Sequence, residues 1–214
     1  MSVINLIIDE YTKSADNYDL ADKLYPSLGL NIEKYRDMTI NALNLKQGDT
    51  VVELGCGTGL NFKRVLEKIG PKGRLIGVDI TEKMLEKAKK RIHKYSWNNV
   101  ELVHSNFEEY KFPKDIDGIF ATIALSHSSK HEQIVKRGYV ALKQGKTFSL
   151  MDFKKSDGVS RIFTPLLLFF TGPFPENGKY IYRQAWKSIE KYFEKTTFQE
   201  GWGGFLYLSV GTKI

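Results

Sequence analysis

A glycine-rich turn at the end of a short apolar run is the part of this chain best suited to hold a ligand. Gly55, Gly57 and Gly59 stand at alternate positions, and Glu53 precedes the first of them by two residues. Glycine adopts positive φ and lets the backbone approach a ligand closely, so such a turn at a strand end predicts a cofactor site. The carboxylate of Glu53 can offset a positive charge on that cofactor.

The spacing of the glycines separates this turn from the usual dinucleotide motif. In the G-x-G-x-x-G fingerprint the third glycine would stand at position 60, where this chain has Leu60. The pattern Glu53-x-Gly55-x-Gly57-x-Gly59 instead resembles the S-adenosyl-L-methionine (SAM) loop of the class I methyltransferases. SAM carries a cationic amino group and a sulfonium in place of a pyrophosphate, so a carboxylate suits it better than a helix N-terminus. An ordinary glycine-rich turn of a doubly wound fold is the alternative.

The resemblance implies further contacts around the turn. SAM is then the cofactor, S-adenosyl-L-homocysteine is the product, and Cys56 takes part through its backbone. Asp79 closes an expected strand, where its carboxylate can accept hydrogen bonds from ribose hydroxyls, although capping a helix is its other use. Ile80 can pack on the adenine ring. No metal is expected, because one cysteine among four scattered histidines gives no ligand spacing.

Asn106 and Phe107 follow the third expected strand. Similar methyltransferases commonly place an Asp followed by a small or apolar residue here, where the pair contacts the adenine edge. Asn106 departs from that pattern, because its amide can donate and accept hydrogen bonds but carries no charge. The resemblance still implies that Asn106 and Phe107 bind the adenine.

His127 follows the fourth expected strand, on the side of the sheet where ligands bind in open α/β folds. The spacing from Ile119 to His127 resembles the phosphoethanolamine methyltransferases, whose histidine here pairs with an N-terminal tyrosine, and Tyr18 resembles that tyrosine. The resemblance implies catalytic roles for both residues, with His127 removing a proton from an amine acceptor. Methyltransferases of unrelated specificity also carry a histidine here, so a non-catalytic His127 is the alternative. The Asp/Asn-Pro-Pro-aromatic motif of nucleic-acid amino-methyltransferases is absent, so nucleic acid is not expected as a partner.

The N-terminal segment carries a second resemblance. Tyr18 and Gly29, followed by Tyr35-Arg36, resemble the quinone C-methyltransferases and the bacterial phosphatidylethanolamine N-methyltransferases, in which this segment caps bound SAM. Tyr11 and Tyr18 are expected one helical face apart, where both rings can shield the sulfonium. The other interpretation is an apolar stripe that packs a helix on the sheet.

A strongly apolar stretch, 161–174, lies within an insert at 157–180. Methyltransferases commonly build their acceptor pocket from inserts at this point. Phe163, Arg183 and Trp186 are therefore predicted to bind the substrate, Arg183 by offering a planar fork to a phosphate or carboxylate. Docking on a membrane and burial in the core are the other interpretations of the stretch.

Length and charge limit the number of domains, the partners and the location that the chain can have. The chain has 214 residues, a single-domain length, and a net charge of +7 from 32 basic and 25 acidic residues. The basic run Glu82–Lys94 is either a solvated helix face or a surface for an anionic partner. The N-terminus lacks the basic start of a signal peptide, and no apolar stretch approaches the ~20 residues that span a bilayer. A cytoplasmic protein is expected, with peripheral contact to an anionic membrane as an option.

Strands alternate with helices along most of the chain, which predicts parallel βαβ units. The expected fold is α/β: a doubly wound, Rossmann-like, mostly parallel seven-stranded sheet with an antiparallel last strand over residues 46–214, and an N-terminal helical cap of the same domain over 1–45. The terminal pair of strands resembles the edge hairpin of the class I methyltransferase sheet. The expected strands are 50–54, 74–79, 100–104, 118–122, 147–151, 194–199 and 204–212, and the expected helices after the cap are 60–69, 82–95, 130–142 and 184–193.

Together these features predict a SAM-dependent methyltransferase that acts on a small or lipid-linked acceptor. An ethanolamine-type amine is the first expectation, and a quinone or other apolar ring is the second. Two other classes of protein compete. An NAD-dependent oxidoreductase would share the fold and Asp79 but is opposed by Leu60. A non-catalytic protein of the membrane surface would keep the apolar stretch and the basic face without turnover.

Titration calorimetry with three ligands separates these classes. SAM and S-adenosylhomocysteine are expected to bind and NADH is not, because the loop offers a carboxylate and lacks the third glycine of the dinucleotide motif. Binding of NADH without binding of SAM would contradict the assignment.

Overall fold

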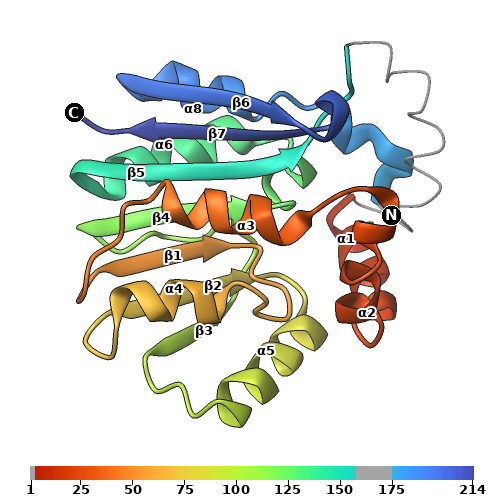
Figure 1. Cartoon of the computed structure of the whole chain (residues 1–214), viewed down its shortest axis with the longest axis horizontal. Helices are drawn as coiled ribbons and strands as arrows, with labels where there is room; N and C mark the ends of the chain where they lie inside the picture. Colours follow the sequence, from red (N-terminus) through yellow and green to blue (C-terminus); the bar gives the residue numbers. More distant parts are fainter. Residues whose placement is uncertain (1–2, 158–174) are drawn as a thin grey trace.

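Seven strands form one mixed sheet in the order β3-β2-β1-β4-β5-β7-β6, in a computed structural model that describes residues 3–157 and 175–214 (Figure 1). The first five strands run parallel, and β7 lies antiparallel between β5 and the edge strand β6. This arrangement confirms the predicted doubly wound sheet and its antiparallel last strand. The strands are β1 (Thr50–Leu54), β2 (Arg74–Asp79), β3 (Val100–His104), β4 (Ile116–Thr122), β5 (Leu142–Phe153), β6 (Lys195–Gly201) and β7 (Leu206–Thr212).

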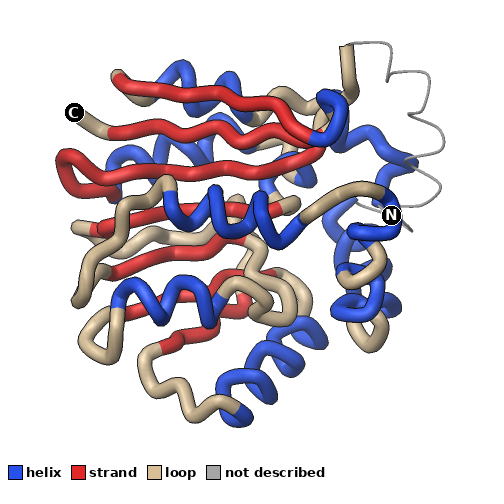
Figure 2. The backbone as a smooth tube through the Cα atoms, viewed as in Figure 1, coloured by secondary structure: helices blue, strands red, loops and turns tan. Residues whose placement is uncertain are grey.

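Helices cover both faces of the sheet, because successive residues of each buried strand point to opposite sides (Figure 2). Val51 and Leu75 pack into one helix layer, whereas Val52 and Ile76 pack into the other. The first layer holds α3 (Ile32–Asn41), α4 (Phe62–Ile69) and α5 (Glu82–Lys94), and the second holds α6 (His131–Ala141) and α8 (Trp186–Tyr192). No helix in the described part of the chain has the length and apolar character needed to cross a membrane.

The carboxyl ends of three central strands lie side by side. Leu54, the last residue of β1, pairs with Val78 of β2 and with Ala121 of β4. The loops that leave these strands are therefore neighbours at one edge of the sheet. In open α/β sheets ligands bind outside this edge, where the strand order reverses.

Two short N-terminal helices lie beyond this edge (Figure 1). They are α1 (Val3–Ser14) and α2 (Tyr18–Asp22), which we call the lid, and the 3-10 turn η1 (Tyr25–Leu28) follows them. The sequence predicts Tyr11 and Tyr18 one helical face apart, but they do not belong to one helix. The chain turns at residues 15–17, where the Asn17 N–H donates to the Ser14 carbonyl at 3.0 Å. The two tyrosine rings still approach, with centroids 6.2 Å apart, but they come from different helices.

Ion pairs fasten the lid to the basic run of α5. Asp16 lies 3.0 Å from Lys83 Nζ and 2.6 Å from Lys87 Nζ. Asp19 pairs with Arg91 and accepts a hydrogen bond of 2.6 Å from the Thr58 hydroxyl in the glycine-rich turn. Part of the basic run thus has partners within the chain itself.

Element boundaries differ from the sequence expectation at a few places. α4 begins at Phe62, because the glycine-rich turn continues through residue 61. β5 begins at Leu142, directly after α6, because Leu142 pairs with Ile116 and Gly145 supplies a positive φ of 74°. Thr81 occupies the position before α5, but its side chain makes no capping hydrogen bond with the helix.

Asp19→Asn is expected to loosen the lid, because it removes the charge that holds Arg91. The amides of α1 and α2 would exchange hydrogen several-fold faster when followed by mass spectrometry. Salt at about 0.5 M would have a similar effect on the unchanged protein, since it screens partly exposed ion pairs. Asp9→Asn is the matched control, because Asp9 pairs with Lys13 within α1. Equal hydrogen exchange in the two variants would contradict the role of the Asp19–Arg91 ion pair in holding the lid.

Candidate functional site

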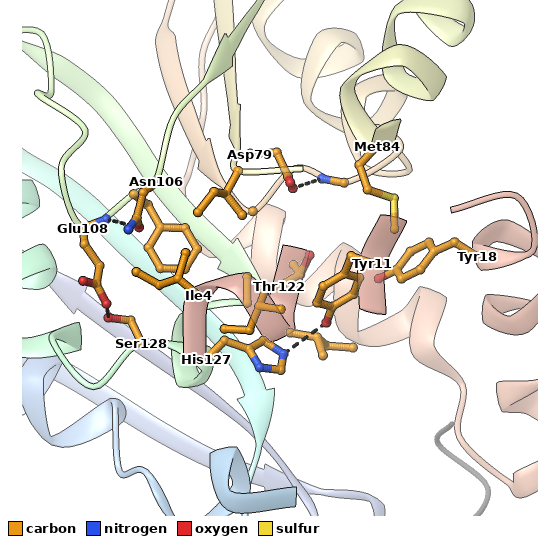
Figure 3. A pocket seen from close by; sticks show the side chains of 17 residues that line it. Ile4, Tyr11, Tyr18, Asp79, Met84, Asn106, Glu108, Thr122, His127 and Ser128 are labelled. Carbon is orange, nitrogen blue, oxygen red and sulfur yellow. Dashed lines mark hydrogen bonds between the residues drawn. The ribbon is translucent and has the colours of Figure 1, made fainter. Parts of the chain in front are cut away.

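A pocket lies between the carboxyl edge of the sheet and the lid (Figure 3). It contains about 690 Å³ of space free of atoms, the open solvent at its mouth included. Its lining comes from the glycine-rich turn, the ends of β2 and β4, the loop after β3, and α1. The predicted site residues that line it are Tyr11, Tyr18, Gly55, Gly57, Asp79, Ile80, Asn106, Phe107 and His127.

The three glycines of the turn serve different purposes, although all have positive φ. A Cβ on Gly55 would stand 2.4 Å from Ala124 Cβ, so Gly55 is needed where the loops after β1 and β4 touch. A Cβ on Gly59 would strike the Phe62 ring at 2.6 Å. Gly57 has open space around it and lines the pocket. Gly57 is therefore the point at which the turn leaves room for a ligand.

Asp79 fixes the glycine-rich turn from the end of β2. Its Oδ2 accepts a hydrogen bond from Gly57 N–H and its Oδ1 accepts one from Thr81 N–H, both at 2.8 Å. Burial raises the pKa of this carboxyl, and the two N–H donors oppose that rise. Each oxygen keeps a lone pair for a further donor, such as a ribose hydroxyl.

Glu53 lies behind the turn and is not among the residues that line the pocket. The side chain is fully buried, and its Oε1 accepts a hydrogen bond of 2.6 Å from Asn61. Its Oε2 has no hydrogen-bond partner among the described residues. Burial raises the pKa of Glu53 to about 8. An unpartnered buried carboxyl oxygen suits a cationic group that arrives with a ligand.

A buried chain of polar groups connects Glu53 with the lid. Asn61, which binds Glu53, also donates to the Thr122 hydroxyl at 3.0 Å and accepts from Arg36 at 3.3 Å. Arg36 in turn pairs with Asp22 of α2 at 2.6 Å. The N-terminal cap is thus tied to the residue behind the glycine-rich turn.

Asn106 and Phe107 line the pocket on the side of β3. The Oδ1 of Asn106 accepts a hydrogen bond of 2.9 Å from Glu108 N–H. This bond fixes the orientation of the amide, so its NH₂ group is left as the donor for a ligand. Ile80 and Phe107 both lie in the wall, where apolar side chains can contact a flat ring.

His127 meets an N-terminal tyrosine, but that tyrosine is Tyr11 rather than Tyr18. The Tyr11 hydroxyl lies 3.1 Å from His127 Nε2, and the two rings meet edge to face at 5.8 Å. Burial raises the pKa of Tyr11 well above its ordinary value, so the phenol keeps its proton. In the tautomer that carries its proton on Nδ1, His127 accepts this hydroxyl proton at Nε2.

Two of the predicted substrate residues lie elsewhere. Arg183 is not in the lining, and its Nη1 donates to the carbonyls of Ser126 and His127 at 2.8 and 3.1 Å. Trp186 is partly buried and packs against the core, with its ring centroid 4.8 Å from that of Tyr207. Phe163 lies outside the described residues, as does the apolar stretch 161–174.

The pocket also contains residues that the sequence reasoning missed. Ile4 and Ile7 line it together with Tyr11, and their spacing of three and four residues is the signal of one helical face that could have revealed them. Met84 of α5, Glu108, and residues at and after the end of β4 line it as well: Thr122, Ile123, Ala124 and Ser128. Asp152 was missed as well: it is buried on β5 and holds the turn that carries His127.

Three features together define a class I SAM-dependent methyltransferase: the order of the strands in the sheet, the glycine-rich turn after β1, and the carboxylate of Asp79 at the end of β2. The open space at Gly57 and the unpartnered Glu53 oxygen fit a cationic nucleoside such as SAM. Solved structures share the fold. A SAM-dependent methyltransferase from Aquifex aeolicus superposes with a TM-score of 0.65 at 20% identity, over 84% of this chain and 89% of that one. A phosphoethanolamine N-methyltransferase from Haemonchus contortus in complex with SAM superposes with a TM-score of 0.68 at 15% identity. The match covers 84% of this chain and 52% of that one.

The chain belongs to the ubiE/COQ5 methyltransferase family, whose model matches residues 6–202. It is 27% identical to a demethylmenaquinone methyltransferase of Listeria welshimeri over 173 residues, which are 79% of this chain and 71% of the relative. It is 26% identical to the ubiquinone/menaquinone biosynthesis C-methyltransferase of Escherichia fergusonii over 153 residues, 71% of this chain and 60% of the relative. The protein is therefore a SAM-dependent methyltransferase. This excludes the two other classes, an NAD-dependent oxidoreductase and a non-catalytic protein of the membrane surface.

The raised pKa of Glu53 predicts pH-dependent cofactor binding. Near pH 7 the empty protein holds this carboxyl mostly protonated, because its pKa is about 8. A cation beside it favours the ionised form, so binding releases a proton and strengthens as the pH rises. Below pH 8 the affinity for SAM is expected to increase by up to about tenfold per pH unit.

Calorimetry from pH 6 to about pH 9 measures this linkage, with Glu53→Gln as the control. The variant is expected to bind SAM more weakly and to lose the part of the pH dependence that Glu53 contributes. Titration of the amino group of SAM itself affects both proteins equally. Identical pH profiles would exclude Glu53 as the group that receives the cation.

Proposed function

We propose that this protein transfers a methyl group from SAM to an apolar ring acceptor of the quinone type, in its reduced, hydroxylated form. The observation that carries the proposal is the Tyr11–His127 pair, an acid–base pair set in a largely apolar pocket wall. The named relatives from Listeria and Escherichia support it, because both act on quinones or their precursors by name.

The electrostatics of the pocket favour such a ring over a phosphorylated ethanolamine, the first expectation from the sequence. Among the described residues, the pocket lining contains the carboxylates Asp79 and Glu108 but neither Lys nor Arg. Arg183 is expected from the sequence to bind a phosphate, but its Nη1 donates hydrogen bonds to main-chain carbonyls. A phosphate would therefore find no Lys or Arg side chain to pair with among the described lining residues. The Haemonchus neighbour, at 15% identity, supports the fold alone.

Five residues are proposed to hold the cofactor. Asp79 would accept the ribose hydroxyls, and Asn106 and Phe107 would contact the adenine. Gly57 leaves room for the backbone to approach, and Glu53 would offset the positive amino group, directly or through water. When bound, SAM supplies an electrophilic methyl group that is displaced in line from its sulfur.

The Tyr11–His127 pair is proposed to move the proton of the acceptor. Tyr11 Oη takes the proton of a ring hydroxyl while its own proton passes to His127 Nε2. The electron pair released into the ring forms the new C–C bond at the carbon beside that hydroxyl, and the C–S electrons stay on the sulfur. The ring carbon then loses its proton to water, and the ring oxygen regains one from the His127 imidazolium through Tyr11, which restores the aromatic ring and leaves one proton released per turnover.

The lid is proposed to exclude water from this reaction. Ile4 and Ile7 stand in the wall beside Tyr11, so closure of α1 places apolar surface and the phenol in position together. In-line displacement requires reacting atoms about 3–3.5 Å apart, which a closed wall helps to maintain.

A quinone-type acceptor with a lipid tail also accounts for the expected partner and location. We propose a lipid-linked small molecule as acceptor and peripheral contact with an anionic membrane surface. The net charge of +7 supports the second part of this proposal.

An assay with methyl-labelled SAM tests the acceptor. Chemically reduced demethylmenaquinone is expected to become labelled, and phosphoethanolamine is not. His127→Ala is expected to lower kcat by about 10²- to 10⁴-fold, because it removes the proton acceptor. Labelling of phosphoethanolamine alone would overturn the proposal.

Two tyrosine variants test which phenol belongs to the pair. Tyr11→Phe is expected to lower kcat strongly with little change in SAM affinity, since Tyr11 carries the hydroxyl next to His127. Tyr18→Phe is the matched comparison and is expected to have the smaller effect. The reverse ranking would assign the role to Tyr18.

A further inference from the structure

The turn that carries His127 is held at both its N–H and its carbonyl groups by charged side chains from other parts of the chain. This turn, η2 (Leu125–His127), follows β4 and is buried. Neither of the two side chains that hold it, Asp152 and Arg183, lines the pocket.

Asp152 holds the N–H side of the turn. It stands near the end of β5 and is fully buried. Its Oδ2 accepts from Ser126 N–H at 2.9 Å, and its Oδ1 accepts from the Ser126 hydroxyl at 2.8 Å and from Phe153 N–H at 2.9 Å. Burial raises the pKa of Asp152 to about 6, and these donors oppose the rise, so the carboxylate is ionised at neutral pH.

Arg183 holds the carbonyl side. It follows η4 (Pro175–Tyr182), and its Nη1 donates to the carbonyls of Ser126 and His127. The same segment places the buried Tyr180 ring 5.1 Å from the imidazole. The segment after the insert thus contacts both the backbone and the ring of His127.

The backbone before the turn explains why such support is needed. Ile123 has a φ of +52°, a conformation that a β-branched residue adopts only under constraint. Its neighbour Ala124 lies against Gly55 with no room for a further carbon atom. The strained backbone persists because the surrounding contacts fix it, and a shift here would move His127.

We propose that Asp152 and Arg183 are positioning residues for methyl transfer, which fix the His127 imidazole against Tyr11 by holding the N–H and hydroxyl of Ser126 and the carbonyls of Ser126 and His127. The inference rests on the proposed role of the Tyr11–His127 pair. It reassigns Arg183 from substrate binding to support of the site, and it gives a role to a buried acid that the glycine-rich turn does not involve.

Kinetics of three variants test the inference with chemically reduced demethylmenaquinone as acceptor. Asp152→Asn leaves Ser126 N–H facing an amide, and Arg183→Met removes the donor to the carbonyls. Each is expected to lower kcat at least about tenfold, because small displacements of a reacting group are costly. Ser126→Ala, which removes only the hydroxyl, is expected to have a smaller effect.

Affinity for S-adenosylhomocysteine separates positioning from general damage. Calorimetry is expected to give values for the three variants within about twofold of the unchanged protein, because these hydrogen bonds of Asp152 and Arg183 reach neither Asp79 nor the glycine-rich turn. Ser149→Ala is the control for a buried polar change on β5, and Arg74→Gln is the control for loss of an arginine on the surface; both are expected to leave kcat unchanged. A parallel loss of affinity and kcat would overturn the inference.

A double-mutant cycle identifies the residue through which Asp152 acts. In a His127→Ala background, Asp152→Asn is expected to lower the residual kcat by less than about twofold, because the group it positions is absent. A full tenfold or greater loss in that background would show that Asp152 acts elsewhere and would overturn the inference.

Imidazole resonances give a readout that does not depend on the acceptor. The chain has four histidines, so ring-labelled histidine gives a small set of signals, and His127→Ala assigns the relevant one. Asp152→Asn and Tyr11→Phe are both expected to shift the His127 signal and to leave those of His93 and His104 in place. An unmoved His127 signal would overturn the positioning role. A shifted signal without turnover of demethylmenaquinone would instead reject the proposed acceptor while the positioning role stands.

Discussion

Two buried carboxylates at the ends of parallel strands hold the site together by accepting hydrogen bonds from loops that leave other strands. Asp79, at the end of β2, binds the N–H of Gly57 after β1. Asp152, near the end of β5, binds the N–H and hydroxyl of Ser126 after β4. The cofactor side and the reactive side are thus each fixed by one acid, and the contact between Gly55 and Ala124 sets the distance between them.

Burial of these acids has an electrostatic cost that the protein offsets unevenly. Asp79 and Asp152 each receive backbone donors, which favour the ionised form. Glu53 has one neutral donor and an unpartnered oxygen, and its pKa rises to about 8. An uncompensated buried acid is expected at a functional site rather than in a structural core. The missing partner of Glu53 is, on this account, the cation of the ligand.

The lid connects the two sides of the site. Asp19 attaches it to the glycine-rich turn through Thr58, and Asp22 attaches it to the network behind Glu53 through Arg36. The same lid brings Tyr11 to His127. One short segment therefore contacts the glycine-rich turn, the network behind Glu53 and His127, and it is held partly by ion pairs at the surface and partly by a buried pair.

The sequence by itself determined the sheet, and it singled out the glycine-rich turn, Asp79, Asn106 and Phe107, which the structure brings to one pocket. These features depend on local spacing: alternation of strands and helices, glycines two apart, an acid at a strand end. Only the tertiary structure decided which tyrosine meets His127, since the turn at residues 15–17 changes which side chain reaches across 116 positions of chain. The tertiary structure likewise showed that the Arg183 side chain binds backbone carbonyls of the turn that carries His127. A contact between distant segments depends on how helices pack over the sheet edge, and no short-range pattern in the chain encodes that geometry.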